Sequence, residues 1–188
     1  MKKKHIEWLV TVVVISVLYF TGWYKDVSSF LQRGMLQTGL FNAETEATAK
    51  VPADFNLQLR TINGDLVHLS ELKGKVIFMN LWATWCPPCV AEMPGIHDLY
   101  EAYADNENVA FVMLAIKDSD TRIQNYITKK SFTFPVYTSV GTVPEVYQTG
   151  SIPSTFIISK DGYIVSTEKG MRNYDTKKYH KFLDKLIN

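Results

Sequence analysis

The chain has 188 residues, of which 46% are hydrophobic and 13% aromatic, and its formal net charge is +1. This length is enough for one folded domain with its own core and leaves room for an appendage. Basic residues form no stripe interleaved with aromatic ones, so the sequence favours no nucleic-acid partner. Two cysteines are too few for a disulfide-rich scaffold.

The N-terminal stretch departs from this ordinary composition. Three lysines at residues 2–4 precede an apolar run over residues 6–24, in which Glu7 is the one charged residue. As a helix this run spans about 28 Å, close to the hydrocarbon thickness of a bilayer, and Trp8 and Trp23 lie near its ends, where aromatic side chains are favoured. The residues that follow offer no small-residue cleavage site and no cysteine for lipidation. We therefore predict an uncleaved, single-pass signal anchor with the lysines in the cytoplasm and the rest of the chain outside it.

Three regions follow from this reading. Residues 1–25 are the cytoplasmic tip and transmembrane anchor, residues 26–50 a juxtamembrane segment and linker, and residues 51–188 the folded domain. Within the second region, apolar residues recur at helical spacing at Val27, Phe30, Leu31 and Met35. Such a helix can continue the membrane helix, lie on the membrane surface or pack on the domain, and the sequence leaves all three open. The polar stretch NAETEATAK that follows is typical of a linker.

The folded domain alternates strand and helix patterns. Asn63-Gly64 lies between two stretches in which apolar and polar residues alternate, and this pattern predicts a hairpin. Residues 160–162, between the stretches STFIIS and YIVSTE, predict a second hairpin. Short apolar runs predict buried strands at 75–82 and 108–116. Helices are predicted over 89–105, from Ser119 or Asp120 onward, and over 175–188. This alternation predicts an α/β fold around a mixed sheet.

The two cysteines, Cys86 and Cys89, occur in the stretch WATWCPPCVAEMP. Haem attachment is excluded because Val90, not histidine, follows the second cysteine. Structural zinc needs four ligands, and the four histidines are scattered. A purely structural disulfide is weak because the loop is so short. The spacing suits thiol-disulfide exchange, since Cys89 can attack a mixed disulfide on Cys86; a Cu(I) carrier that uses both thiolates stays open as an alternative.

The local sequence favours exchange chemistry. A strand leads into the pair and a helix follows, which puts Cys86 at the helix N-cap, where free N–H groups and the helix dipole favour a thiolate. Pro87 and Pro88 suit the first turn but remove two donors, which leaves chiefly the N–H of Cys89. A less stabilised thiolate means a lower reduction potential. We therefore predict a reducing or intermediate redox pair.

These motifs resemble those of the thioredoxin superfamily, and more narrowly the membrane-anchored TlpA/ResA/CcmG group of extracytoplasmic thiol-disulfide oxidoreductases. WATWCPPC is similar to the active-site motif, Pro94 to the proline that kinks the active-site helix, and SIPSTFIIS to the loop that carries a cis-proline. The resemblance covers residues 51–188 and implies a thioredoxin-like fold, a mixed central sheet flanked by helices. It also implies a substrate-binding site at Trp85, Ile152, cis-Pro153 and Ser154.

The resemblance also bears on two polar residues. Thioredoxins carry a buried Asp six residues before the first cysteine, where this chain has Asn80, which cannot take a proton. ResA-like proteins lack that Asp and carry a Glu three residues after the second cysteine, where this chain has Glu92. One helical turn places Glu92 on the face of Cys89, and the resemblance implies that it accepts the proton of that thiol. The competing reading is a solvated Glu in the first turn of a helix.

The function implied is that of a protein disulfide reductase without metal or cofactor. Cys86 is the nucleophile, Cys89 the resolving cysteine, and the two form a redox-active disulfide. The substrate is a protein disulfide, in apocytochrome c or in a copper-site protein of an oxidase, and cytochrome c maturation is the favoured pathway. A membrane electron donor regenerates the enzyme on the periplasmic side.

Overall fold

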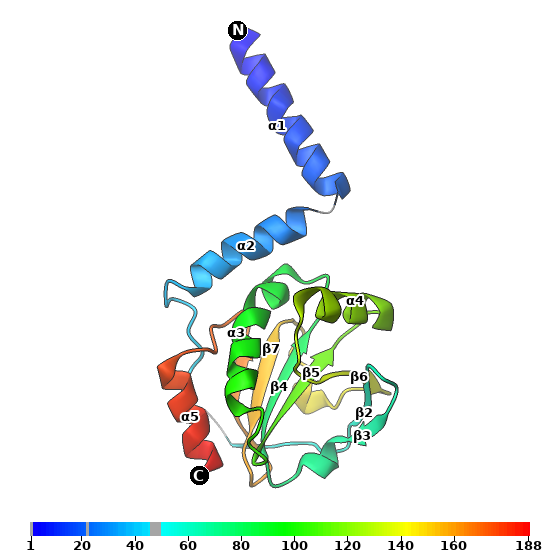
Figure 1. Cartoon of the computed structure of the whole chain (residues 1–188), viewed down its shortest axis with the longest axis vertical. Helices are drawn as coiled ribbons and strands as arrows, with labels where there is room; N and C mark the ends of the chain where they lie inside the picture. The colour runs from blue at the N-terminus through cyan, green and yellow to red at the C-terminus, as the bar shows by residue number, and fades with distance from the viewer. Residues whose placement is uncertain (1, 22, 46–49) are drawn as a thin grey trace.

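The computed structural model describes residues 2–21, 23–45 and 50–188. Among these residues, eight strands form one mixed sheet in the order β1-β8-β7-β4-β5-β6-β2-β3 (Figure 1). The mixed sheet and its flanking helices confirm the predicted α/β architecture. The strands are β1 (Val51–Pro52), β2 (Gln58–Thr61), β3 (Leu66–His68), β4 (Val76–Trp82), β5 (Val109–Ala115), β6 (Val136–Val140), β7 (Ser154–Ile158) and β8 (Tyr163–Lys169).

Helices cover the sheet unevenly. Buried side chains of α3, α4 and α5 pack with one face of the sheet, and the opposite face is covered by the 3₁₀ turns η1 and η2 and by the chain around Leu57. Both predicted hairpins form, between β2 and β3 and between β7 and β8. The helical elements are α1 (Lys2–Thr21), α2 (Tyr24–Leu36), η1 (Leu69–Leu72), α3 (Pro87–Tyr103), α4 (Asp120–Lys130), η2 (Glu145–Tyr147) and α5 (Lys177–Ile187).

Strand β4 is the centre of the sheet. It pairs parallel with β5 and antiparallel with β7, and all of its residues are buried. Successive side chains of a strand point to opposite faces. Phe78 and Trp82 therefore belong to the cluster that includes α3, whereas Met79 and Leu81 belong to the cluster on the other face. Asn80 lies between Phe78 and Trp82 in this alternation and faces α3.

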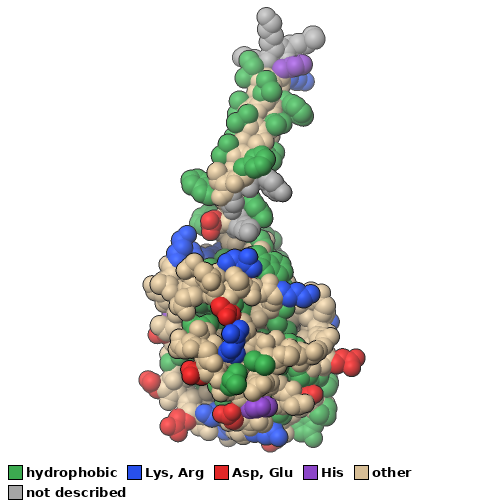
Figure 2. Space-filling view, turned by 90° about the vertical axis from the view of Figure 1, so that its right-hand side faces the viewer, with side chains coloured by type: hydrophobic (Ala, Val, Ile, Leu, Met, Phe, Trp, Pro, Cys, Tyr) green, Lys and Arg blue, Asp and Glu red, His purple; other side chains and the backbone are tan. Residues whose placement is uncertain are grey.

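The N-terminal helix α1 protrudes from the domain, and hydrophobic side chains are visible along it (Figures 1 and 2). The sequence predicted a transmembrane helix here. Across the part of the chain that the structure describes, no helix combines the length and the apolar character needed to traverse a bilayer.

Helix α2 packs on α3, which selects one of the three arrangements that the sequence left open. The contact does not use the apolar repeat. Among the described side chains of α2, Ser29 and Leu36 are the buried ones, whereas Phe30 and Leu31 of the apolar repeat are exposed. Following α2, the chain pairs with the segment before α5, because Asn173 N–H donates to the Phe41 carbonyl at 2.7 Å. Residues 46–49 of the predicted linker lie outside the described residues.

Candidate active site

A disulfide joins Cys86 and Cys89 at the start of α3, with 5.3 Å between the two Cα atoms. Cys86 is the N-cap, and the N–H of Cys89 donates to its Sγ at 3.3 Å. Pro87 and Pro88 occupy the first helical positions, where prolines break no helical hydrogen bond. Cys86 is 4% exposed and Cys89 is 0% exposed. An incoming partner therefore reaches the sulfur of Cys86 first.

The loop before β7 lies against this disulfide. The Ile152–Pro153 peptide bond is cis, and the Ile152 carbonyl oxygen lies 3.8 Å from Cys86 Sγ. The loop is tied down on both sides, since Gly170 N–H donates to the Pro153 carbonyl at 2.9 Å and Ser154 Oγ donates to the Ser151 carbonyl at 2.9 Å. The backbone of this loop is thus held beside the reactive sulfur.

Trp85 directly precedes Cys86 in the sequence and is 42% exposed. Its indole Nε1–H donates to the Lys117 carbonyl at 3.1 Å. The next residue, Asp118, accepts from both the backbone N–H and the hydroxyl of Thr84, at 2.7 and 2.6 Å. Burial raises the pKa of Asp118, but hydrogen bonds from Thr84, Arg122 and Ser119 outweigh it and lower the pKa overall. The ionised carboxylate therefore fixes the loop that supports Trp85.

A groove of about 410 Å³ lies beside Trp85 and Ile152. Aliphatic and aromatic residues supply much of its lining, and Lys117 and residues of the loop before the cis-proline supply the rest. It can accept an apolar side chain of a bound peptide. Its lining residues are Leu81, Trp85, Ile116, Lys117, Val143, Tyr147, Gln148, Thr149, Gly150, Ser151 and Ile152.

Glu92 is 1% exposed, so it is not the solvated residue of the competing reading. Asn80 Nδ2 donates to its Oε1 at 2.8 Å, and the backbone N–H of Arg172 donates to its Oε2 at 3.0 Å. Burial raises the pKa of Glu92 from 4.5 to about 8, although the two hydrogen bonds and the charge of Arg172 lower it. A carboxyl group with this pKa can both hold and release a proton near neutral pH.

Four further residues extend this polar cluster, namely Thr155, Glu168, Arg172 and Tyr174, and the sequence reasoning did not find them. Thr155 Oγ1 accepts from Asn80 Nδ2 at 2.9 Å and from the Tyr174 hydroxyl at 2.7 Å. Arg172 Nε donates to the buried Glu168 at 2.9 Å. Thr155 follows the predicted proline loop and could have been suspected from that position. Arg172 and Tyr174 carry no such sequence signal, because the fold brings them in from a distant part of the chain.

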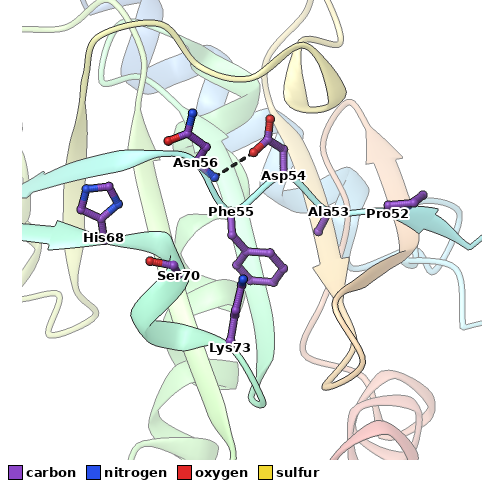
Figure 3. Close-up of a pocket in the computed structure, with 8 residues that line it drawn as sticks. All are labelled: Pro52, Ala53, Asp54, Phe55, Asn56, His68, Ser70 and Lys73. Atoms are coloured by element: carbon purple, nitrogen blue, oxygen red, sulfur yellow. Dashed lines mark hydrogen bonds between the residues drawn. The ribbon is translucent and has the colours of Figure 1, made fainter.

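A second hollow, of about 650 Å³, lies between the chain before β2 and the start of η1 (Figure 3). Phe55 and Lys73 approach one another there, with Lys73 Nζ 5.1 Å from the ring centroid. None of its lining residues belongs to the disulfide motif or to the cis-proline loop.

Cys86 and Cys89 are the thiol ligands that the chain offers to a soft metal, and within the described ranges no group of three or more His, Cys, Asp or Glu side chains could hold an ion.

Comparison with known proteins gives this geometry a family. The Redoxin family profile matches residues 46–183. Thiol-disulfide oxidoreductase ResA of Bacillus cereus is 32% identical over 132 residues, which are 70% of this chain and 75% of that protein. The crystal structure of StoA from Bacillus subtilis superposes with a TM-score of 0.56 at 26% identity, over 68% of this chain and 97% of that one. A thiol:disulfide interchange protein of the thioredoxin family from Chlorobium tepidum has a TM-score of 0.59 at 24% identity, over 75% of this chain and 100% of that one, and shows the fold.

The fold and the cysteine pair thus define a thioredoxin-like thiol-disulfide oxidoreductase. The chain belongs to the redoxin family and is a ResA/CcmG-like member of the thioredoxin superfamily.

Proposed function

We propose that this oxidoreductase is a protein disulfide reductase in which Cys86 attacks the substrate and Cys89 releases it. The observation that carries the proposal is the position of Cys86 Sγ, at the N-cap of α3 and 3.8 Å from the Ile152 carbonyl oxygen. In the reduced enzyme the Cys86 thiolate attacks one sulfur of a substrate disulfide. A mixed disulfide forms, the substrate S–S bond breaks, and the second substrate sulfur leaves as a thiolate.

Resolution needs the second cysteine as a thiolate. Cys89 is fully buried, so its ionisation is unfavourable unless a nearby group takes the proton. Glu92 follows by one helical turn on the same face and, in its ionised form, serves as that proton acceptor. The Cys89 thiolate then attacks Cys86 Sγ, the Cys86–Cys89 disulfide forms, and the substrate departs as a dithiol with two electrons gained.

The substrate docks as an extended segment along the cis-proline loop. Ile152 precedes Pro153, and an extended peptide can pair with its backbone, whereas Ser154 is fully buried and supports the loop through its hydrogen bond to the Ser151 carbonyl. Trp85 and the 410 Å³ groove beside it accept a neighbouring apolar side chain of the substrate. We assign substrate recognition to Trp85, Ile152 and Pro153, and we assign to the fully buried Ser154 the support of this loop.

The direction of electron flow follows from the N-cap. Helix N-caps normally receive hydrogen bonds from the N2 or N3 N–H group. Here the N1 and N2 positions are prolines, and the Cys89 N–H is the donor to Cys86 Sγ. A thiolate with fewer donors is less stabilised, which lowers the reduction potential. The pair accordingly acts as a reductant that a donor must recharge.

We further propose that α1 attaches the domain to the outer face of a membrane. The lysines at residues 2–4, the apolar run and the exposed apolar side chains of α1 support this assignment. An extracytoplasmic domain of this type draws electrons from a membrane donor. Its substrates are then the cysteines of apocytochrome c or of an oxidase copper site, with cytochrome c maturation favoured by the resemblance of the CPPC region.

Trapping tests the catalytic assignment. The full-length Cys89→Ser variant should accumulate a mixed disulfide between Cys86 and its substrate in cells, and mass spectrometry identifies the attached protein. The Cys86→Ser variant is the matched control and should trap nothing. Trapping by Cys86→Ser alone would reverse the two roles, and stoichiometric Cu(I) binding without exchange activity would replace the reductase with a carrier.

Fractionation tests the membrane assignment separately. The full chain should sediment with membranes, resist extraction by alkaline carbonate, and expose its domain to protease added from outside the cytoplasmic membrane. Recovery of the chain in the soluble fraction would overturn attachment while leaving the chemistry of the cysteine pair unaffected.

A further inference from the structure

Helix α2 lies along the first turns of the active-site helix α3. Near its middle, Ser29 Oγ donates to the carbonyl of Pro87, inside the CPPC motif, at 3.2 Å. Near its end, Leu36 shares a cavity with Ala91 and Gly95 of α3. Ser29 is 3% exposed and Leu36 8% exposed, so this contact is a formed interface from the active-site cysteines to the second turn.

The chain after α2, residues 41–44, forms hydrogen bonds with Glu168 and Asn173, which lie before α5. Asn173 N–H donates to the Phe41 carbonyl at 2.7 Å, and Ala43 N–H donates to the Asn173 carbonyl at 3.1 Å. Glu44 N–H donates to the carboxylate of Glu168 at 2.7 Å. Glu168 also binds Arg172, whose backbone N–H donates to Glu92. Residues 24–44 therefore contact both segments that enclose Glu92.

A cavity of about 230 Å³ lies between these three segments, and Glu92 is one of its lining residues. The cavity is large enough for several waters, since one water needs roughly 10–15 Å³ of such volume. Arg33 Nε is buried and has no hydrogen-bond partner within the described residues. Buried polar groups of this kind commonly bind ordered water. The lining residues are Arg33, Leu36, Gln37, Ala91, Glu92, Pro94, Gly95, Asp98, Arg172, Asn173 and Asp175.

We propose that residues 24–44 are a working part of the redox site: they wall the polar cavity that Glu92 lines and thereby control the access of water and protons to that carboxyl. These residues precede the region that the family profile matches, which begins at residue 46. The inference rests on the proposed role of Glu92, because a proton taken from Cys89 must leave the protein before the next turnover.

The charges around Glu92 are consistent with a cavity route. On the β4 side, Asn80 is uncharged and Glu92 is bound to it. Tyr174 and Tyr179 on the α5 side remain protonated, because burial, with the charge of Glu92 among the further causes, raises the pKa of both far above the ordinary value. The charged residues that line the cavity are Arg33, Asp98, Arg172 and Asp175. Glu168 pairs with Arg172, and His180 pairs with Asp175.

A matched pair of leucine substitutions on α2 tests the proposal in the full-length protein. Leu36→Gln places an amide in the α2–α3 contact, whereas Leu31→Gln makes the same change at a residue that is 63% exposed. The readouts are the pKa of the Glu92 carboxyl and its hydrogen–deuterium exchange rate, both from the infrared carbonyl band that Glu92→Gln abolishes. Leu36→Gln should lower that pKa by about one unit or more and speed exchange about tenfold, and Leu31→Gln should change neither.

A second substitution narrows the cavity without altering α2. A Cβ at Gly95 would lie 3.7 Å from Asn173 Oδ1 and 4.0 Å from Asp175 Cβ, which are ordinary contacts. Gly95→Leu extends a side chain into the cavity and should slow exchange of the Glu92 proton several-fold, with Gly95→Ala close to the unaltered protein. This variant decides the matter if Leu36→Gln does not fold.

The proposal is overturned if Leu36→Gln releases α2, as judged by new protease cleavage within residues 23–40, and the titration and exchange of Glu92 stay unchanged. It is equally overturned if Gly95→Leu leaves the exchange rate unaltered. The proposed role of Glu92 as proton acceptor fails by a different result, namely a Glu92→Gln variant whose pH profile of disulfide exchange matches that of the unaltered enzyme, and the reductase function itself is tested by the trapping experiment.

Discussion

Asn80 and Glu92 are joined by a 2.8 Å hydrogen bond between β4 and α3, and both side chains are buried. The amide occupies the strand position from which thioredoxins present a carboxyl, according to the resemblance described above. In this protein the titratable group is on the helix instead. The amide donates to the carboxyl and cannot itself take a proton, so Glu92 is the member of this pair that titrates.

The first prediction concerns stability as a function of pH. Glu92 has a pKa of about 8 in the folded protein against 4.5 ordinarily. Between these values the unfolded chain has lost this proton and the folded chain retains it. Glu92 therefore leaves the free energy of unfolding at its full value below pH 4.5. As the pH rises from 4.5 toward 8, the free energy of unfolding falls, by about 5 kcal/mol at most.

Glu92→Gln should remove this pH dependence and raise the free energy of unfolding near pH 8. Urea denaturation of both proteins at pH 5, 6, 7 and 8 measures it. Equal slopes of stability against pH in the two proteins would show that Glu92 does not titrate as its burial indicates.

The second prediction tests the Asn80–Glu92 pair directly. Asn80→Asp places a second carboxyl within hydrogen-bond distance of the first, and two such groups in a buried site share a proton. The pair should titrate with two separated pKa values, the upper one at least about one unit above that of Glu92 in the unaltered protein. Infrared titration of the carboxyl bands provides the values. Asn80→Ala, which adds no charge, is the control, and an upper pKa that stays near 8 contradicts the prediction.

The third prediction concerns the reduction potential. Pro88 occupies the N2 position of α3 and has no N–H to offer Cys86. Pro88→Ala restores that donor, stabilises the Cys86 thiolate and should raise the potential by roughly 30 mV for each unit by which the thiol pKa falls. Equilibration with glutathione buffers measures the potential. Pro52→Ala, on edge strand β1, should leave it unchanged, and a lowered potential for Pro88→Ala would refute the argument from missing donors.

The fourth prediction concerns the support of Trp85. Asp118 accepts hydrogen bonds from Thr84, Ser119 and Arg122. Its lowered pKa means that this stabilisation is present at neutral pH and is lost as the pH falls through that pKa. Asp118→Asn, which cannot accept all of these bonds, should cost about 1–3 kcal/mol at pH 7 and shift the fluorescence of the exposed Trp85.

Asp120→Asn is the control for this change, because Asp120 makes an exposed ion pair with Arg60 and such pairs contribute little. Chemical denaturation and tryptophan emission are the two measurements. If both variants lose the same stability, the buried carboxylate does not hold the Trp85 loop.

Short-range patterns in the sequence were sufficient for the chemistry of the cysteine pair. The N-cap position of Cys86 and the start of the helix at the two prolines that follow it depend on neighbouring residues. The hairpins at Gly64 and Gly162 are equally local, since each glycine adopts a positive φ that the turn requires. Such features are determined by backbone sterics and hydrogen bonding within a few residues.

The environment of Glu92 was decided by the tertiary structure. Its pKa depends on burial and on the N–H of Arg172, which lies 80 residues further along the chain. The packing of α2 likewise escaped the sequence, because the apolar repeat at Phe30 and Leu31 faces outward and the polar Ser29 faces α3. Burial is a property of contacts between segments that are remote in sequence. Residue spacing alone could therefore identify the candidate site residues, but it could not determine which of their side chains are exposed to water.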